Sequence, residues 1–257
     1  MESVKQRYFL ELAYNGTNYH GWQVQHNAIS VQEKINEVLQ TILRQPIETI
    51  GAGRTDTGVH AKQLFAHFDT EKLDLSVDKK RFLHSMNSLL PHDISVQNIL
   101  AVQLDAHARF DATSRSYEYH IHFDKNPFLN NLSWLLRDFP KVERMNEAAE
   151  HLLGTKDFSC FSKSNTQVFT NICTITRAEW VLENNGLIFH VTANRFLRNM
   201  VRAIVGTLLE IGVKNKPIEY VDDVLKSQNR SEAGASVPAH GLYLTKIKYP
   251  YIEENEN

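Results

Sequence analysis

The sequence predicts an α+β protein made of two ferredoxin-like halves, residues 1–105 and 106–257. Strand and helix patterns follow one another as β-α-β-β-α-β in the first half and in nearly the same order in the second. Asn-Gly turn signals favour antiparallel neighbours. We therefore expect a mainly antiparallel sheet with helices on its outer face and a central active-site cleft where the halves meet.

In the first half, RYFLELAY (7–14) alternates in the manner of a strand and ends at the turn signal Asn15-Gly16. Ser30 opens a predicted helix, and Glu33 three residues later completes a capping box. The remaining predicted elements are strands at 47–53 and 63–70, a helix near 78–90 and a strand near 94–104.

The second half begins with the predicted strand SRSYEYHIHF (114–123). A predicted helix at 142–154 ends at a glycine, as helices commonly do. The later elements are strands near 171–183 and 186–193 joined by Asn184-Asn185-Gly186, helices at 194–212 and near 217–227, and a strand at 241–249.

The composition is that of a soluble globular protein, with 42% hydrophobic and 23% charged residues in a chain of 257. We expect no membrane span and no secretion signal, and therefore a cytoplasmic protein. Cys160 and Cys173 have no framework spacing and are expected to be reduced, partly buried thiols. The net charge of −2 means that a nucleic-acid binder would have to gather its positive charge in a patch.

Residues 51–61, GAGRTDTGVHA, place three glycines around Arg54 and Asp56. Because glycine loses the most backbone entropy on ordering, this stretch fits a tight turn rather than a helix or strand. Two interpretations remain open for it. It is either a surface turn with a solvated ion pair or a functional loop.

Residues 193–212 contain Arg195, Arg198 and Arg202, spaced three and then four apart. On a helix this spacing puts the three guanidinium groups on one face. The stripe is either a solvated face or an RNA-binding face, in which one arginine pairs with a carboxylate and its neighbours meet phosphates.

Basic and aromatic residues interleave in residues 105–123, where Arg109 and Arg115 precede Tyr117 and Tyr119. Aromatic rings stack on unpaired bases, and arginines bind the adjoining backbone. The two tyrosines share one strand face, so they are either such a platform or ordinary amphipathic sheet residues.

The sequence gives little reason to expect a metal or a cofactor. His60 lies four residues after Asp56, but no third ligand has a recognisable spacing. Dinucleotide-binding, P-loop and nucleophile-elbow motifs are absent from the sequence. The candidate chemistry is therefore one aspartate supported by arginine and tyrosine, which suits catalysis at a sugar carbon.

Several ordered motifs resemble those of the tRNA pseudouridine synthase A family over nearly the whole chain. They are YNGTNYHGWQ followed by SVQEKI, GAGRTDTGVHA, HARFDAT with RSYEY, NRFLRNMVRAIVG and GLYL. Thr57 stands where alanine is common in the family. The resemblance implies the pseudouridine synthase fold and isomerisation of uridine at positions 38, 39 and 40 in the tRNA anticodon stem-loop.

The resemblance also implies residue roles. Asp56 would be the catalytic aspartate, and Arg202 would form the salt bridge that holds it. Arg54 would enter the space left by the flipped target base, Tyr117 would stack on that base, and Arg109 would contact RNA.

The other implied RNA contacts are Lys125 and the loop 162–167, which contains Lys163 and Asn165. The family works as a homodimer without metal or cofactor, and one tRNA spans both subunits.

Two other classes of protein remain as alternatives. One is a non-catalytic RNA-binding protein on a ferredoxin-like scaffold, which would not need Asp56 beside Arg54 and Arg202. The other is a glycosidase or metal-assisted hydrolase, which would need a second carboxylate or a ligand set that the sequence does not show.

Overall fold

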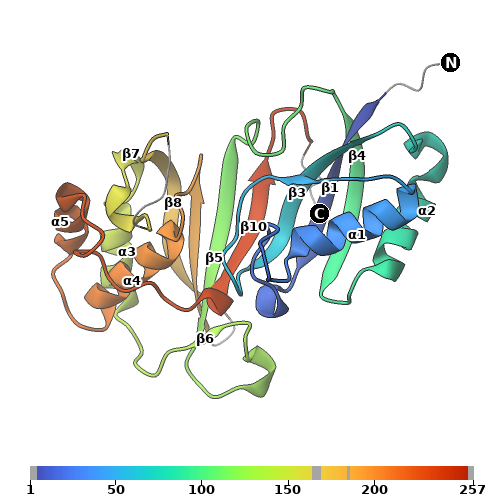
Figure 1. Cartoon of the computed structure of the whole chain (residues 1–257). Helices are drawn as coiled ribbons and strands as arrows, with labels where there is room; N and C mark the ends of the chain where they lie inside the picture. Colours follow the sequence, from blue (N-terminus) through green and yellow to red (C-terminus); the bar gives the residue numbers. More distant parts are fainter. Residues whose placement is uncertain (1–4, 164–168, 184–185, 254–257) are drawn as a thin grey trace. The chain divides into compact units, whose positions relative to one another are not determined.

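The computed structural model describes residues 5–163, 169–183 and 186–253 (Figure 1). The chain forms two compact units. The first unit comprises Met1–Thr113 and Leu244–Asn257, and the second comprises Ser114–Tyr243. This division differs from the expected one at residue 105, because residues 106–113 and the C-terminal segment group with the first unit.

The first unit has the predicted element order β-α-β-β-α-β. Its strands run in the order β4-β1-β3-β10, and β2 pairs with β3. The pairings of β1 with β3 and β4, and of β2 with β3, are antiparallel. The elements are β1 (Gln6–Tyr14), α1 (Val31–Leu43), β2 (Ile50–Gly51), β3 (His60–Thr70), α2 (Leu75–Leu89), β4 (Ile94–Val102) and, from Leu244 onward, β10 (Leu242–Lys248).

Helix α1 begins where the sequence predicts. The Ser30 hydroxyl accepts a hydrogen bond from the Glu33 backbone N–H at 3.2 Å, and the Glu33 carboxylate accepts one from the Ser30 N–H at 3.4 Å. Such a capping box satisfies two helix-end donors, and loss of the cap costs about 1 kcal/mol. The helix ends at Leu43, and the next residue, Arg44, adopts a left-handed conformation with φ 51°.

Strand β2 is much shorter than the predicted strand at 47–53. In the stretch before β2, side-chain amides of α1 make the hydrogen bonds that a neighbouring strand would otherwise make. The Gln32 amide donates to the Thr49 carbonyl at 2.5 Å, and the Thr49 N–H donates to the Asn36 side chain at 3.0 Å. The Ile47 carbonyl likewise accepts from Gln40. The backbone of this stretch is therefore satisfied without a sheet ladder.

Both faces of the first unit's sheet are covered. Helices α1 and α2 contact each other and lie on one face (Figure 1). On the other face, the Phe9 ring lies 5.3 Å from the Tyr249 ring, and the Tyr249 hydroxyl donates to the Ala108 carbonyl at 2.5 Å. The Ala108 N–H in turn donates to Nδ1 of His67. These contacts explain why residues 106–113 and the C-terminal segment belong to this unit.

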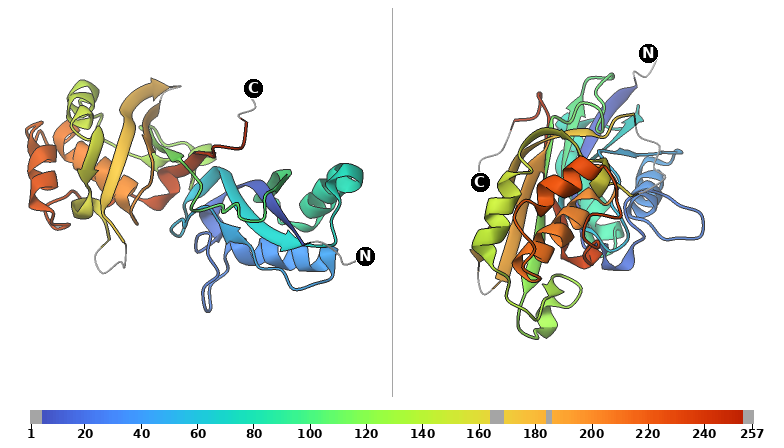
Figure 2. Two further views of the ribbon diagram at one scale, coloured as in Figure 1. Left: turned by 90° about the horizontal axis from the view of Figure 1, so that it is seen from above. Right: turned by 90° about the vertical axis from the view of Figure 1, so that its left-hand side faces the viewer.

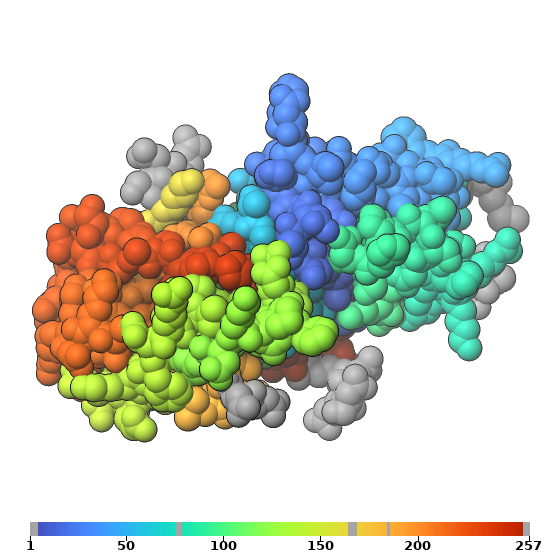
Figure 3. Space-filling model, turned by 90° about the horizontal axis from the view of Figure 1, so that it is seen from below, coloured from blue at the N-terminus to red at the C-terminus, as the bar shows by residue number. Residues whose placement is uncertain are grey.

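The loop between the first strand and α1 projects from the unit. Gln25 and Ala28 form an isolated antiparallel bridge within it. Figure 2 (left) and Figure 3 show this segment, in dark blue, as a narrow projection.

The second unit is also a mostly antiparallel α+β arrangement. Its strands run in the order β5-β9-β8-β7, with the short β6 parallel to β5. Helix α3 packs against β8 and α4, and the two helices lie side by side in Figure 2 (right). The elements are β5 (Ser114–His122), β6 (Trp134–Leu135), α3 (Val142–Glu150), β7 (Gly154–Asp157), β8 (Ile172–Glu183), β9 (Gly186–Ala193), α4 (Met200–Gly212) and α5 (Tyr220–Ser227).

Helix α3 is shorter than the predicted helix at 142–154. It ends at Glu150, and turns at His151, Leu152 and Leu153 follow it. Gly154 has φ +88°, a conformation that favours glycine, and it begins the strand β7 that the sequence did not indicate. Asn184 and Asn185 of the predicted turn lie outside the described residues.

Helix α4 begins at Met200, six residues later than predicted. Asn199, directly before it, has φ 68° in the left-handed region, which ends any helix arriving from its N-terminal side. Arg195 and Arg198 therefore precede the helix, and only Arg202 lies on it. The predicted stripe of three arginines on one helical face is wrong.

The two cysteines are more deeply buried than expected. Cys160 and Cys173 are both 0% exposed, and both thiols are free. Burial raises the pKa of Cys160 to about 12 and that of Cys173 to about 11. Within the described residues, no helix is long and apolar enough to span a membrane.

The buried imidazole of His67 makes the stability of the first unit depend on pH. Burial, with a smaller contribution from Arg7, lowers the pKa of His67 from 6.5 to about 4. As the pH falls below 6.5, the imidazole of His67 takes up a proton in the unfolded chain but stays neutral in the folded chain until the pH approaches about 4. The free energy of unfolding therefore decreases. The expected loss from this group between pH 7 and pH 5 is about 2 kcal/mol.

The variant His67→Asn tests this prediction, because its amide oxygen can still accept the Ala108 N–H. Urea denaturation at both pH values should show that wild type loses about 2 kcal/mol more than the variant over this interval. Equal losses in the two proteins would contradict the assignment to His67.

Candidate active site

The glycine-rich loop between β2 and β3, residues 52–59, carries Arg54 and Asp56. The Ala52 N–H donates to the Phe65 carbonyl at 2.8 Å, which fixes the start of the loop. The Val59 N–H donates to the Asp56 carbonyl at 3.1 Å. This bond closes a four-residue turn in which Gly58, with φ +77°, occupies the third position, where a type II turn requires glycine.

A supporting segment, residues 14–22, lies directly against this loop. A Cβ atom on Gly16 would lie 2.0 Å from the Val59 carbonyl oxygen, and one on Gly21 would lie 2.1 Å from that of Thr55. The Gly58 N–H also donates to the Tyr19 carbonyl at 3.3 Å. The two glycines of the supporting segment therefore allow a backbone approach that no other residue permits.

His60 joins the same two segments. Its side chain is buried, and its Nδ1 accepts a hydrogen bond from the Gly16 N–H at 3.0 Å. It is the first residue of β3, so the predicted turn ends before it. The described part of the chain contains no group of three or more His, Cys, Asp or Glu side chains placed to hold a metal ion.

Arg54 and Asp56 flank Thr55 on this loop. Arg54 is exposed, whereas Asp56 is half-buried. The structure therefore brings the predicted acid and the predicted base-displacing arginine onto one supported loop. Neither side chain contributes to the hydrophobic core of the unit.

Arg109 lies on a second well-supported turn of the first unit. The His107 N–H donates to the Asp111 carboxylate at 2.7 Å, and His107 Nδ1 accepts from the Arg109 N–H at 3.1 Å. The Tyr251 hydroxyl also donates to Asp111. The Arg109 guanidinium lies 5.7 Å from the centre of the exposed Phe110 ring.

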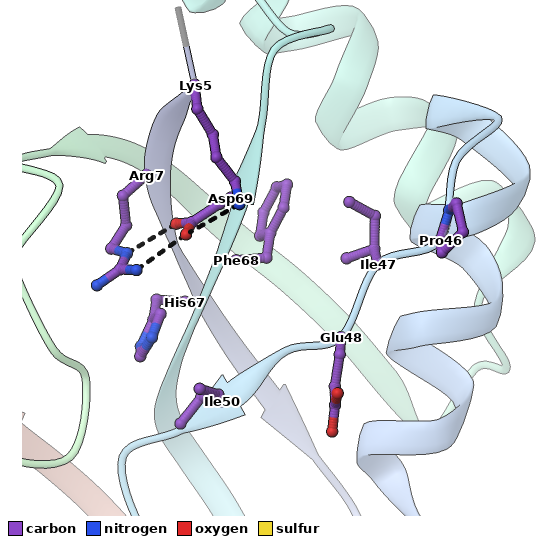
Figure 4. Close-up of a pocket in the computed structure, with 9 residues that line it drawn as sticks. All are labelled: Lys5, Arg7, Pro46, Ile47, Glu48, Ile50, His67, Phe68 and Asp69. Carbon is purple, nitrogen blue, oxygen red and sulfur yellow. Dashed lines mark hydrogen bonds and ion pairs between the residues drawn. The ribbon is translucent and has the colours of Figure 1, made fainter.

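A pocket of about 210 Å³ opens elsewhere on the first unit (Figure 4). On one wall the Arg7 guanidinium contacts both carboxylate oxygens of Asp69, at 2.7 and 2.9 Å, and also donates to the Ala106 carbonyl. Lys5 lies 3.9 Å from the same carboxylate. None of the predicted site residues lines this pocket, and the charges of Lys5, Arg7 and Asp69 are paired with one another.

Tyr117 and Tyr119 share one face of β5, as predicted, but they differ in burial. Tyr119 is fully buried, and its hydroxyl donates to the Pro238 carbonyl at 2.9 Å. Tyr117 is half-buried, and its ring meets the Phe196 ring edge-on at 5.1 Å. Tyr119 is thus a core residue, and Tyr117 is the partly exposed one.

Arg202 lies on α4 in the second unit, where its orientation is fixed. Its Nε donates to the Val237 carbonyl at 2.7 Å. The segment that contains Val237 is held against α4 through Gly206, where a Cβ atom would lie 1.9 Å from the Ala235 carbonyl oxygen. The Gly234 N–H also donates to the Thr207 hydroxyl at 2.9 Å.

The remaining predicted contacts lie at the surface of the second unit. Arg195 is half-buried, and Arg198 is exposed. The exposed Lys163 lies beside Arg198, because its backbone N–H donates to the Arg198 carbonyl at 3.0 Å. Lys125 is exposed after β5, and Asn165 lies outside the described residues.

The sequence patterns did not indicate that Tyr14, Thr55 and His60 support the loop. Their roles depend on contacts between segments that are more than thirty residues apart. The spacing of Gly16 and Gly21 is the signal that could have indicated a close backbone approach.

Comparison with known proteins assigns the family. A family model described as tRNA pseudouridine synthase matches residues 148–250. Proteins called tRNA pseudouridine synthase A are 50% identical in Bacteroides fragilis and 48% identical in Porphyromonas gingivalis, each covering 95% of this chain and 97% of the relative. The protein of that name in Staphylococcus aureus is 36% identical, covering 97% of this chain and 93% of the relative. The chain therefore belongs to the tRNA pseudouridine synthase A family, a family of RNA-modifying isomerases.

Proposed function

We propose that this protein converts uridine to pseudouridine at positions 38, 39 and 40 in the anticodon stem-loop of tRNA, with Asp56 as the catalytic residue. The observation that carries the proposal is the supported loop. It places a half-buried carboxylate beside an exposed arginine, on a backbone held by a second segment. Membership of the family supports the reaction class.

The proposed reaction is an internal rearrangement. The C1′–N1 bond of the uridine breaks, the uracil turns, and C5 bonds to the same sugar carbon while the C5 proton moves to solvent and N1 gains one. No atoms are lost and no electrons are exchanged with a partner. A carboxylate close to the sugar and base is suited to nucleophilic or electrostatic catalysis of such a step.

The target base must leave the RNA stack before it can react. Unstacking costs a few kcal/mol. In the proposed complex the Arg54 side chain enters the vacated space, and the Tyr117 ring stacks on the extruded base, which offsets this cost. The exposure of Arg54 and the partial exposure of Tyr117 are consistent with these roles.

Arg202 is proposed to pair with Asp56 and to orient its carboxylate. A guanidinium has five N–H donors in a planar fork, which suits bidentate contact with a carboxylate. The bond from Nε to the Val237 carbonyl fixes the plane of the group and so supports a directional role.

The RNA backbone is proposed to contact a set of basic and polar side chains on both units. Phosphate and 2′-hydroxyl contacts of this kind do not read sequence, which fits the acceptance of neighbouring uridines. From the resemblance we also propose a cytoplasmic homodimer that uses neither metal nor cofactor. The proposed contacts are Arg109, Arg195, Arg198, Lys125, Lys163 and Asn165.

The variant Asp56→Asn tests the catalytic role. It keeps the size of the side chain but removes the charge and the nucleophile, so turnover should fall by about a thousand-fold or more. Pseudouridine formation in an unmodified tRNA transcript, mapped by mass spectrometry, gives the rate, and a filter-binding titration gives the affinity.

Loss of turnover with retained tRNA affinity supports the catalytic assignment. A variant that converts uridine at the wild-type rate would contradict it. A wild-type protein that binds tRNA without converting any uridine would instead identify a non-catalytic RNA-binding protein.

Arg202 and Arg198 should give different results when each is replaced by alanine. Arg202→Ala should lower kcat about ten- to a hundred-fold, because the carboxylate loses its charged partner. Arg198→Ala, and likewise Arg195→Ala, should mainly weaken tRNA binding and reduce the slope of log affinity against log salt by about one. Equal effects of the substitutions on kcat and on the salt slope would contradict this division of roles.

A further inference from the structure

We infer that Thr55 is a positioning residue for the proposed reaction, because its hydroxyl links the loop that carries Asp56 to the supporting segment. The inference rests on the proposed function of Asp56. In this role the Thr55 hydroxyl holds the loop in its reactive geometry before RNA binds.

The Thr55 hydroxyl bonds to two different parts of the supporting segment. Its Oγ1 accepts a hydrogen bond from the Trp22 backbone N–H at 3.0 Å. The same oxygen lies 2.9 Å from the Tyr14 hydroxyl, and either group can donate there. One side chain thus joins the end of β1 to the segment that leads into α1.

These hydrogen bonds are partly buried, and two large buried side chains lie beside them. Tyr14 is 4% exposed and Trp22 is 2% exposed. The Trp22 indole also lies where a Cβ atom of Gly51 would be, with its Nε1 2.3 Å from that position. Because the site is partly buried, removing the hydroxyl would leave the Trp22 N–H and the Tyr14 hydroxyl without this partner, which costs free energy.

The backbone around Thr55 is held at the same place. Its carbonyl group approaches Gly21, which has φ +85° and no room for a side chain. On the far side of Asp56, Val59 donates to the Asp56 carbonyl, and the Gly58 N–H donates to Tyr19. Asp56 therefore lies between two fixed points, one residue before it and two to three residues after it.

This arrangement assigns Thr55 a specific task. With the backbone fixed on both sides, the Asp56 carboxylate retains only its own side-chain torsions. The backbone conformation at Thr55 also sets the directions in which the side chains of Arg54 and Asp56 point away from the loop. A displacement of about 1 Å at a reacting group can cost about a hundred-fold in rate, so the Thr55 hydroxyl should control kcat without contacting RNA.

Three variants separate this role from simple packing. Thr55→Val keeps the shape of the side chain but removes both hydrogen bonds, and Thr55→Ser keeps the hydroxyl. Thr57→Val is the matched control, because Thr57 is an exposed threonine of the same loop with no assigned part in the reaction. Each is assayed for kcat and KM with a tRNA transcript, for tRNA affinity and for thermal unfolding.

The expected result is a kcat about ten-fold or more below wild type for Thr55→Val, with KM and tRNA affinity changed less than about two-fold. Thr55→Ser should recover most of the rate, and Thr57→Val should equal wild type. Tyr14→Phe removes one of the two hydrogen bonds, so its kcat should lie between those of Thr55→Val and wild type.

Two results would overturn the inference while leaving the proposed function intact. One is an active wild-type protein whose rate is unchanged in Thr55→Val. The other is a Thr55→Val protein that loses rate, affinity and thermal stability together and is not restored by serine, which indicates packing alone. A wild-type protein without any uridine conversion would overturn the proposed function and this inference with it.

Discussion

The close contact between the supporting segment, residues 14–22, and the glycine-rich loop is the constraint on which the account of this protein depends. Glycine-rich backbone is costly to order, because each glycine loses more conformational freedom than any other residue. Here that cost is offset by hydrogen bonds along the loop at Ala52, Thr55 and Gly58, and by one directly after it at His60. The loop is thus a fixed part of the first unit's structure.

The same contact explains why both segments need glycine. On the supporting segment, Gly16 and Gly21 let carbonyl groups of the loop approach to distances at which a Cβ atom would clash. On the loop, Gly58 adopts the positive φ that closes the turn after Asp56. The Asp56 side chain is thus carried by a stretch of backbone that is fixed by hydrogen bonds and has few bulky side chains. Such a stretch allows a nucleotide to come close while the geometry of the carboxylate is preserved.

A comparable principle operates at Arg202. Gly206 and Gly234 bring the segment that contains Val237 against α4, and the Val237 carbonyl then fixes the guanidinium. In both units, glycines bring a neighbouring backbone segment against the element that carries the charged residue. Charged groups that are oriented before the substrate binds need no reorganisation during the reaction, which is how electrostatic catalysis gains most of its effect.

The sequence predicted those features that depend on local patterns. The capping box of Ser30 and Glu33 and the order of elements in the first unit follow from spacing and turn residues, and the structure confirms them. The predicted start of α4 at residue 194 was wrong, because arginine spacing alone cannot reveal that Asn199 adopts a left-handed conformation. The short β2 and the hydrogen bonds of Thr55 depend on contacts with distant segments, through the Gln32 side chain and the Trp22 backbone, so no local pattern could have indicated them.

Hydrogen–deuterium exchange of the loop amides in the RNA-free protein measures whether the supporting segment holds the loop before RNA binds. If the supporting segment holds the loop in its reactive form, the amides of Ala52, Gly58 and Val59 should exchange slowly, and tRNA binding should add little protection. Exchange of these three amides at the rate of an unstructured peptide, with protection gained only when tRNA is added, would contradict the account.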